Sequence, residues 1–146
     1  MNLPVTEEIN QYISSVPEPK RGEMIRIQEL VRQVLPDGKL WFESGKNSED
    51  KTVSNPTIGY GAYIIHYANG TSREFFQIGL SANTTGISVY IMGIKDKTYL
   101  LRTFGDSIGK ATVTGYCIKF KTIQGIHLEV LEAALRSGLA LTTPAR

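Results

Sequence analysis

The segment from Thr57 to Lys121 decides the fold, because it carries four apolar runs separated by turn signals. They read TIGYGAYIIHY (57–67), REFFQIGL (73–80), ISVYIM (87–92) and GYCIKFK (115–121). Runs of this length that are rich in β-branched and aromatic residues favour strands. Asn69-Gly70 is a strong hairpin signal, and residues 82–86 supply the next turn. We therefore expect antiparallel strands, the first three joined as hairpins.

Helical patterns flank and interrupt these strands. Thr6 with Glu7 and Glu8 suits a helix N-terminus, and Met24, Ile27 and Val31 follow helical spacing. The predicted helices cover residues 6–14, 19–35, 97–104 and 126–137, with Asp96 capping the third and Gly138 stopping the last. This order predicts an α+β class, with an antiparallel sheet packed against N- and C-terminal helices.

Length and composition indicate one domain in a reducing compartment. The 146 residues fit a single domain, with a core at about 6–138 and a tail at 139–146. One cysteine excludes an intramolecular disulfide framework. The acidic, polar start does not look like a signal peptide, and no apolar run approaches the roughly 20 residues of a membrane helix. We expect a cytoplasmic protein with no membrane partner.

The formal net charge of +2 is mildly basic. A nucleic-acid binder usually clusters Lys and Arg far more densely. Strand alternation already explains the interleaved aromatic and basic residues of 116–121. From the sequence alone we do not expect a nucleic-acid partner.

Strand alternation assigns side chains to two faces of the sheet. The face that we expect against the helices carries Phe76, Ile78, Leu80, Ile87, Val89, Ile91, Ile118 and Phe120. The opposite face, called the second face below, carries Phe75, Gln77, Gly79, Ser88, Tyr90, Met92, Cys117, Lys119 and Lys121. Large apolar groups beside lysines are unusual for a merely solvated face, so something is expected to cover it.

Three interpretations of the second face remain open. The segment at Trp41-Phe42 and the polar loop at 45–55 could fold over it. A second copy of the chain could pair with it as a homodimer interaction module. A small anionic or aromatic ligand could bind there, and the candidate residues for such a site are Tyr60, Phe75, Tyr90, Met92, Cys117 and Lys119.

Signatures of catalysis or of metal binding are weak in this chain. His66, His127 and Cys117 are far apart in sequence, and no zinc motif occurs. Lys119 and Lys121 could lower the pKa of the Cys117 thiol, but no general base is adjacent. We identify no catalytic residue and expect a non-enzymatic protein, with an unrecognised enzyme as an alternative. Gly59 and Gly61 lie inside a predicted strand, which indicates a bulge or a close backbone approach.

Three segments together resemble the YdhG-like family, a bacterial domain family of largely unknown function. They are the Tyr12–Pro19 entry into a helix, the Ile58–Tyr63 strand, and the run from Gly109 to Lys121 before an Ile/Leu-rich helix. The chain departs from the family pattern because it lacks a proline after Tyr60-Gly61 and has a longer polar loop at 45–55.

The resemblance implies a small-ligand or iron carrier, since the family includes a frataxin-like protein proposed to carry iron. Oxygen ligands suit iron. The carboxylates that would hold it here are Glu7, Glu8, Glu18 and Glu23. Helix N-termini favour acidic residues in any case, so their positions have an ordinary explanation as well.

Overall fold

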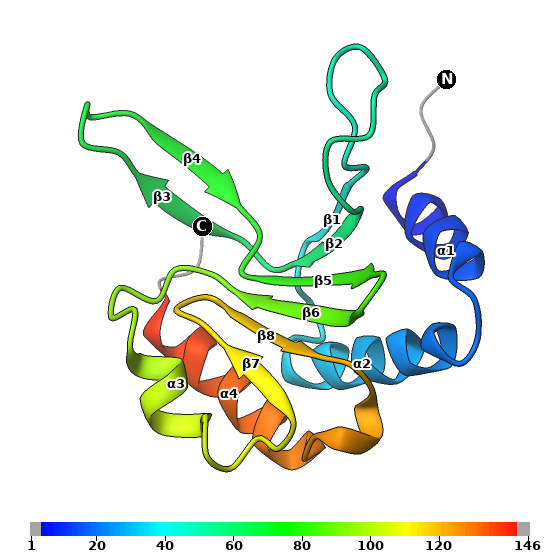
Figure 1. Ribbon diagram of the computed structural model, residues 1–146. Helices are drawn as coiled ribbons and strands as arrows, with labels where there is room; N and C mark the ends of the chain where they lie inside the picture. The colour runs from blue at the N-terminus through cyan, green and yellow to red at the C-terminus, as the bar shows by residue number, and fades with distance from the viewer. Residues whose placement is uncertain (1–3, 143–146) are drawn as a thin grey trace.

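A computed structural model describes residues 4–142 of the chain, drawn in Figure 1. The helices are α1 (Val5–Ser15), α2 (Lys20–Val34), α3 (Tyr99–Phe104) and α4 (Leu128–Leu141), with a short 3-10 turn at Ile123–Gly125. The strands are β1 (Leu40–Glu43), β2 (Thr57–Tyr60), β3 (Tyr63–His66), β4 (Ser72–Phe75), β5 (Ile78–Asn83), β6 (Gly86–Ile91), β7 (Ala111–Val113) and β8 (Cys117–Phe120).

Within residues 4–142 the strands form a six-stranded sheet in the order β1-β2-β5-β6-β8-β7 and a separate β3-β4 hairpin. All neighbouring strands pair antiparallel. Helices α2 and α4 cover one face of the six-stranded sheet (Figure 1). The predicted α+β class, with an antiparallel sheet against N- and C-terminal helices, is confirmed.

The hydrophobic core lies between the sheet and these helices. Val31 of α2, Val89 of β6 and Leu131 of α4 are all fully buried in it. The strand residues predicted to face the helices are buried in the same core: Ile78, Leu80, Ile87, Val89, Ile91, Ile118 and Phe120. The predicted phase of β5, β6 and β8 is therefore correct.

The prediction for Phe76 is wrong: its ring lies on the second face and not against the helices. The predicted strand at 73–80 breaks at Phe76-Gln77, and its two parts belong to different sheets. The predicted strand at 57–67 breaks in the same way at Gly61-Ala62, where Gly61 has φ +77°. The chain leaves the sheet after Tyr60, forms the hairpin and returns at Gln77, whose N–H donates to the Tyr60 carbonyl. The alternation of side chains between the two faces in one strand therefore does not predict the faces in the strand beyond the break.

The C-terminal helix is longer than predicted. It runs to Leu141, so the expected stop at Gly138 and the tail beginning at 139 are wrong; the rest of that tail, 143–146, lies outside the described residues. Gly138 is buried inside α4, where an added Cβ would lie 2.2 Å from Cγ2 of Ile91. The glycine lets the helix approach β6 closely. The described helices include none with the length and apolar character needed to cross a membrane.

Replacing Gly138 with Ala tests this close approach. Alanine favours a helix by about 1 kcal/mol over glycine, but an unaccommodated methyl in a packed core costs roughly 1–3 kcal/mol. We expect Gly138→Ala to lower the free energy of unfolding by up to about 2 kcal/mol in urea titrations, since the methyl cost exceeds the helix gain. In an Ile91→Ala background, where the space is vacated, the same change should be neutral or stabilising. Equal losses in both backgrounds would contradict the contact.

Candidate ligand-binding face of the sheet

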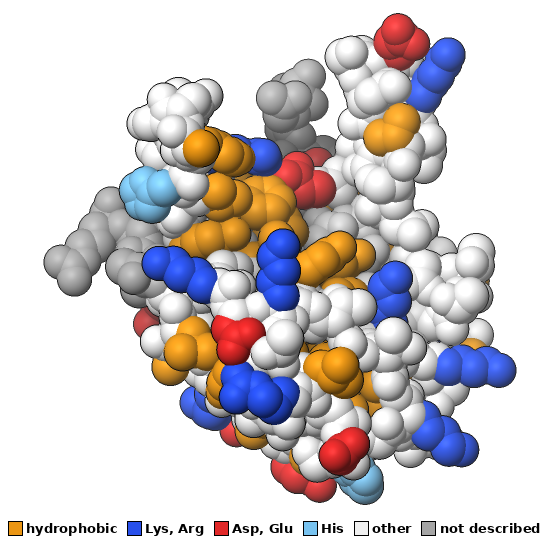
Figure 2. All heavy atoms as spheres, turned by 60° about the vertical axis from the view of Figure 1, so that its left-hand side comes forward, with side chains coloured by type: hydrophobic (Ala, Val, Ile, Leu, Met, Phe, Trp, Pro, Cys, Tyr) orange, Lys and Arg blue, Asp and Glu red, His pale blue; other side chains and the backbone are white. Residues whose placement is uncertain are grey.

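The second face of the sheet is not covered by α2 or α4, which lie on the opposite side (Figure 1). The β3-β4 hairpin and the loop between β1 and β2 rise on either side of it. In Figure 1 the loop stands away from β6 and β8, so it does not form the cover there that was one of the three interpretations. Figure 2 also shows hydrophobic side chains gathered beneath the hairpin, with Lys and Arg side chains beside them.

Two paired glycines leave space on this face of the sheet for a large side chain to pack against the backbone. Gly59 of β2 lies opposite Gly79 of β5. A Cβ at either position would lie 2.7 Å from the Phe76 side chain. Phe76 can therefore lie flat against the sheet and is only 5% exposed. The prediction at Gly59 was a bulge or a close backbone approach, and the structure instead shows the Phe76 side chain packed closely against the glycine.

Five aromatic side chains, here called the aromatic stripe, cross the second face from β1 to the start of β8. The Trp41 ring meets Phe75 edge-on at 6.2 Å between centroids, and Phe75 lies 4.1 Å from Phe76. Phe76 and Tyr90 both border Gly79. Tyr90 then stacks with Tyr116 at 6.2 Å and 13° between ring planes.

The two ends of the stripe differ in exposure. At one end Trp41 and Phe75 are half-buried, and the indole N–H of Trp41 donates to the Gly61 carbonyl at 2.8 Å. This end anchors the hairpin to the sheet. At the other end Tyr90 is half-buried and Tyr116 is 56% exposed. The Tyr90–Tyr116 end therefore presents free aromatic surface.

Cations border the stripe along its length. The Lys39 amine lies 4.3 Å from the centroid of the Trp41 ring, and the Arg73 guanidinium lies 4.7 Å from that of Phe75. Lys39 also pairs with Glu74. On β8, exposed Lys119 lies opposite Ser88 of β6, two residues along the strands from the Tyr90–Cys117 pair and on the same face. Diagonal cross-strand neighbours are within reach of long side chains.

Most of the predicted ligand residues share this face. Phe75 belongs to the stripe, Tyr90 pairs with Cys117, and Lys119 is diagonal to Tyr90. Met92, which directly follows β6, is half-buried. Sequence reasoning did not include Tyr116 or Trp41 among the candidates. Tyr116 precedes β8, so strand alternation does not indicate which way its side chain points. Trp41 lies on this face because it pairs with Gly59 of β2, and that pairing was not predicted.

The prediction that Tyr60 belongs to the ligand site is wrong, because its side chain lies on the helix-covered face of the sheet. It pairs with Ile78, belongs to the hydrophobic core and is 1% exposed. Burial raises the pKa of its hydroxyl, and Gln28 and Arg32 of α2 only partly oppose this shift. Gln28 does not reach hydrogen-bonding geometry, so the hydroxyl has no partner among residues 4–142. Tyr60 therefore cannot contact a ligand on the second face.

The Cys117 thiol has the opposite character from an activated nucleophile. It is 2% exposed, and burial raises its pKa, although Lys119 and Ser88 partly oppose this shift. A raised pKa leaves the sulfur as a neutral thiol at neutral pH, and a thiol reacts far more slowly than a thiolate. The geometry thus favours a packing role for Cys117.

Thiol labelling measures this directly. A disulfide reagent at neutral pH should modify Cys117 at least about tenfold more slowly in the native protein than in urea, because burial both covers the sulfur and reduces the thiolate fraction. The native rate should keep rising to a higher pH than the rate of the unfolded chain. A native rate that equals the unfolded one would contradict the burial of Cys117.

The four predicted iron ligands do not gather into a metal site. The Glu18 carboxylate accepts the Gly22 N–H at 2.9 Å and pairs with Arg21 at 3.3 Å. The Gly22 hydrogen bond is the main reason that the pKa of Glu18 is lowered. Glu23 accepts the Ile123 N–H, while Glu7 and Glu8 lie in the first turn of α1. Residues 4–142 contain no group of three or more His, Cys, Asp or Glu side chains that could hold a metal ion.

Comparison with known proteins finds no matching family model, no matching curated protein and no matching solved structure. The resemblance to the YdhG-like family therefore stays a prediction, as does the iron carriage that it implies.

Proposed function

We propose that this protein is a non-enzymatic binding protein whose second sheet face takes a ligand with a planar ring and an anionic group. The ring lies against Tyr90 and Tyr116, and the anionic group pairs with Lys119. The observation that carries the proposal is a stacked pair of tyrosines, one half-buried and one exposed, beside a lysine that makes no ion pair with any described residue.

The tyrosine pair offers a platform. Centroids 6.2 Å apart are within the range of direct ring contact, about 4.5–7 Å, so a third ring has no room between them. A ligand ring must therefore lie over the outward surface, where Tyr116 is 56% exposed. A planar apolar group that lies there covers exposed ring surface of Tyr116, and a rigid ring loses little conformational entropy when it binds.

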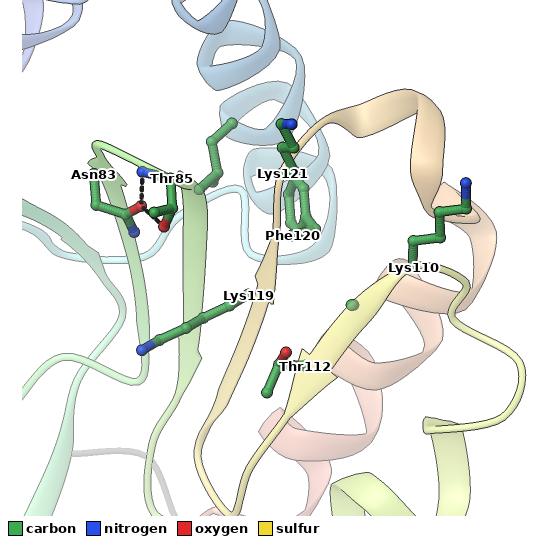
Figure 3. A pocket seen from close by; sticks show the side chains of 9 residues that line it. Asn83, Thr85, Lys110, Thr112, Lys119, Phe120 and Lys121 are labelled. Carbon is green, nitrogen blue, oxygen red and sulfur yellow. Dashed lines mark hydrogen bonds between the residues drawn. The ribbon is translucent and has the colours of Figure 1, made fainter.

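Lys119 supplies the charge that fits such a ligand. Its side chain runs across β6 in Figure 3, over the strand that carries Ser88 and Tyr90. Ser88 is 1% exposed, consistent with the aliphatic stem of Lys119 covering it while the amine stays in solvent. When the ligand ring lies on Tyr90, the anionic group of the same ligand approaches the Lys119 amine. The ligand partly excludes water from between the two charges, which strengthens their attraction.

A homodimer over the same face is the second candidate, because Tyr116 would be an exposed apolar contact. A specific contact buries on the order of 800 Å² per partner. A two-fold dimer here would bring the lysines of both copies to one interface, and like charges oppose that arrangement. The geometry therefore favours an anionic ligand over a second copy.

Adenosine monophosphate is a suitable probe, since it joins a planar ring to a phosphate. We expect it to bind more tightly than adenosine or inorganic phosphate in calorimetry. Tyr116→Leu should weaken it roughly 5- to 150-fold, the value of one stacked base, and Lys119→Gln should remove its advantage over adenosine. Tyr67→Leu in the exposed hairpin turn and Lys51→Gln in the β1-β2 loop are matched controls that should change nothing.

Sedimentation separates the two candidates. Tyr90→Glu should leave the mass unchanged and abolish nucleotide binding if the face holds a ligand. Conversion of a dimer to a monomer by the same change would support the interface instead. No binding of adenosine monophosphate by the folded wild-type protein would overturn the proposed ligand chemistry.

A further inference from the structure

A shallow groove of about 340 Å³ continues the second face beyond Lys119. Its polar lining comes from Lys119 and Lys121 of the β8 segment, Lys110 and Thr112 at β7, and Asn83 and Thr85 in the β5-β6 turn. The three lysines are exposed, and none makes an ion pair with another described residue. A fourth cation, Lys20 of α2, donates to the Asn83 carbonyl at the same turn.

The three lysine side chains do not converge on one point. In Figure 3 Lys119 extends across β6, whereas Lys121 and Lys110 point toward the other end of the strands. A compact anion therefore cannot contact Lys119 together with the other two. Cations spread along a path, without acids between them, fit a chain of successive negative charges.

The aromatic platform and the lysines lie in sequence along one strand. Cys117, which pairs with Tyr90, is followed by Lys119 on β8 and by Lys121 directly after the end of β8. At about 3.3 Å per residue, Lys121 lies roughly 13 Å along the strand direction from the Tyr90 position. Such a path offers one site of ring contact followed by several cations, over a length that exceeds one monomer of a polymer.

Cations also lie at the other end of the stripe, where Arg73 borders Phe75 and Lys39 borders Trp41. At that end Lys39 is paired with Glu74, so Arg73 is the cation that makes no ion pair with a described residue. The surface thus combines ring faces with positive charge at both ends. This is the pattern by which single-stranded nucleic acids are held, since bases stack on aromatic side chains while phosphates meet Lys and Arg. A duplex would keep its base faces hidden from the tyrosines.

We propose that the second face binds a single-stranded nucleic acid, with a base on Tyr90 and Tyr116 and successive phosphates along Lys119, Lys121 and Lys110. This inference rests on the proposed function and extends it, because the ring and the anionic group become one unit of a polymer. It revises the expectation drawn from the net charge and the sequence spacing of the basic residues, since the fold brings Lys110 beside Lys119 and Lys121.

Fluorescence anisotropy with a labelled oligothymidylate of about 12 nucleotides tests the proposal. Three phosphate contacts predict a slope of about −2 in log K against log salt concentration, which is a loss of roughly 16-fold between about 50 and 200 mM salt. Tyr116→Leu should weaken binding roughly 5- to 150-fold.

The decisive variant is Lys110→Gln with Lys121→Gln, because neither lysine belongs to the adenosine monophosphate site. It should flatten the salt slope by about 1.4 and weaken the oligomer while leaving adenosine monophosphate binding unchanged. The matched control is Lys46→Gln with Lys51→Gln in the β1-β2 loop, which removes the same charge and should leave both ligands unaffected. Melting temperatures verify that each variant is folded.

Several results would overturn the inference. If the oligomer binds no more tightly than adenosine monophosphate, the small-ligand proposal is kept and the nucleic-acid proposal is rejected. Equal competition by inorganic polyphosphate, with no effect of Tyr116→Leu, would show a site for charge alone. Equal competition by oligoglutamate would point to an acidic protein, and tighter binding of a duplex would exclude base stacking. Failure of both the oligomer and adenosine monophosphate to bind would reject the two proposals together.

Discussion

The packing of Phe76 against two glycines is the constraint on which the second face depends. Gly59 and Gly79 lie opposite each other in neighbouring strands, and a methyl group on either would occupy the place of the Phe76 ring. With that ring flat on the sheet, Phe75 stacks above it and Trp41 closes the edge. The hairpin is thereby held beside the sheet rather than over it, and Tyr90 and Tyr116 remain accessible.

The sheet phase could be predicted where strands alternate without interruption. In β6 and β8 each inward residue was assigned correctly, because Ile87, Val89 and Ile118 repeat with period two between clear turns. The same reasoning failed at Phe76, since the chain changes sheets there while the apolar alternation continues across the break. Gly138 failed for a related reason: a glycine near a helix end indicates a stop, yet the need to approach Ile91 overrides it. Both errors arise from tertiary contacts that local sequence does not encode.

The candidate site could be predicted only in part. Alternation placed Tyr90, Cys117 and Lys119 on one face, and the structure keeps them there. Tyr60 was assigned to that face although it lies on the core side, because the direction of its side chain depends on the break at Gly61. Tyr116 lies before the first residue of β8, so only the folded turn brings it onto Tyr90. The lysine groove joins β7, β8 and the β5-β6 turn, and no strand was predicted at the position of β7.

The small polar side chains at the centre of this face make their hydrogen bonds within the protein. Ser81 donates to the Pro56 carbonyl at 2.6 Å, and the Asn83 amide donates to Ser88 at 3.0 Å. These bonds satisfy hydroxyl groups that are almost fully buried, which would otherwise carry a desolvation cost of about 1–3 kcal/mol each. With their hydrogen bonds made within the sheet and its loops, the serines present little surface to solvent. The serines therefore add neither ring surface nor charge to this face, so any binding there would rest on the aromatic stripe and on the lysines.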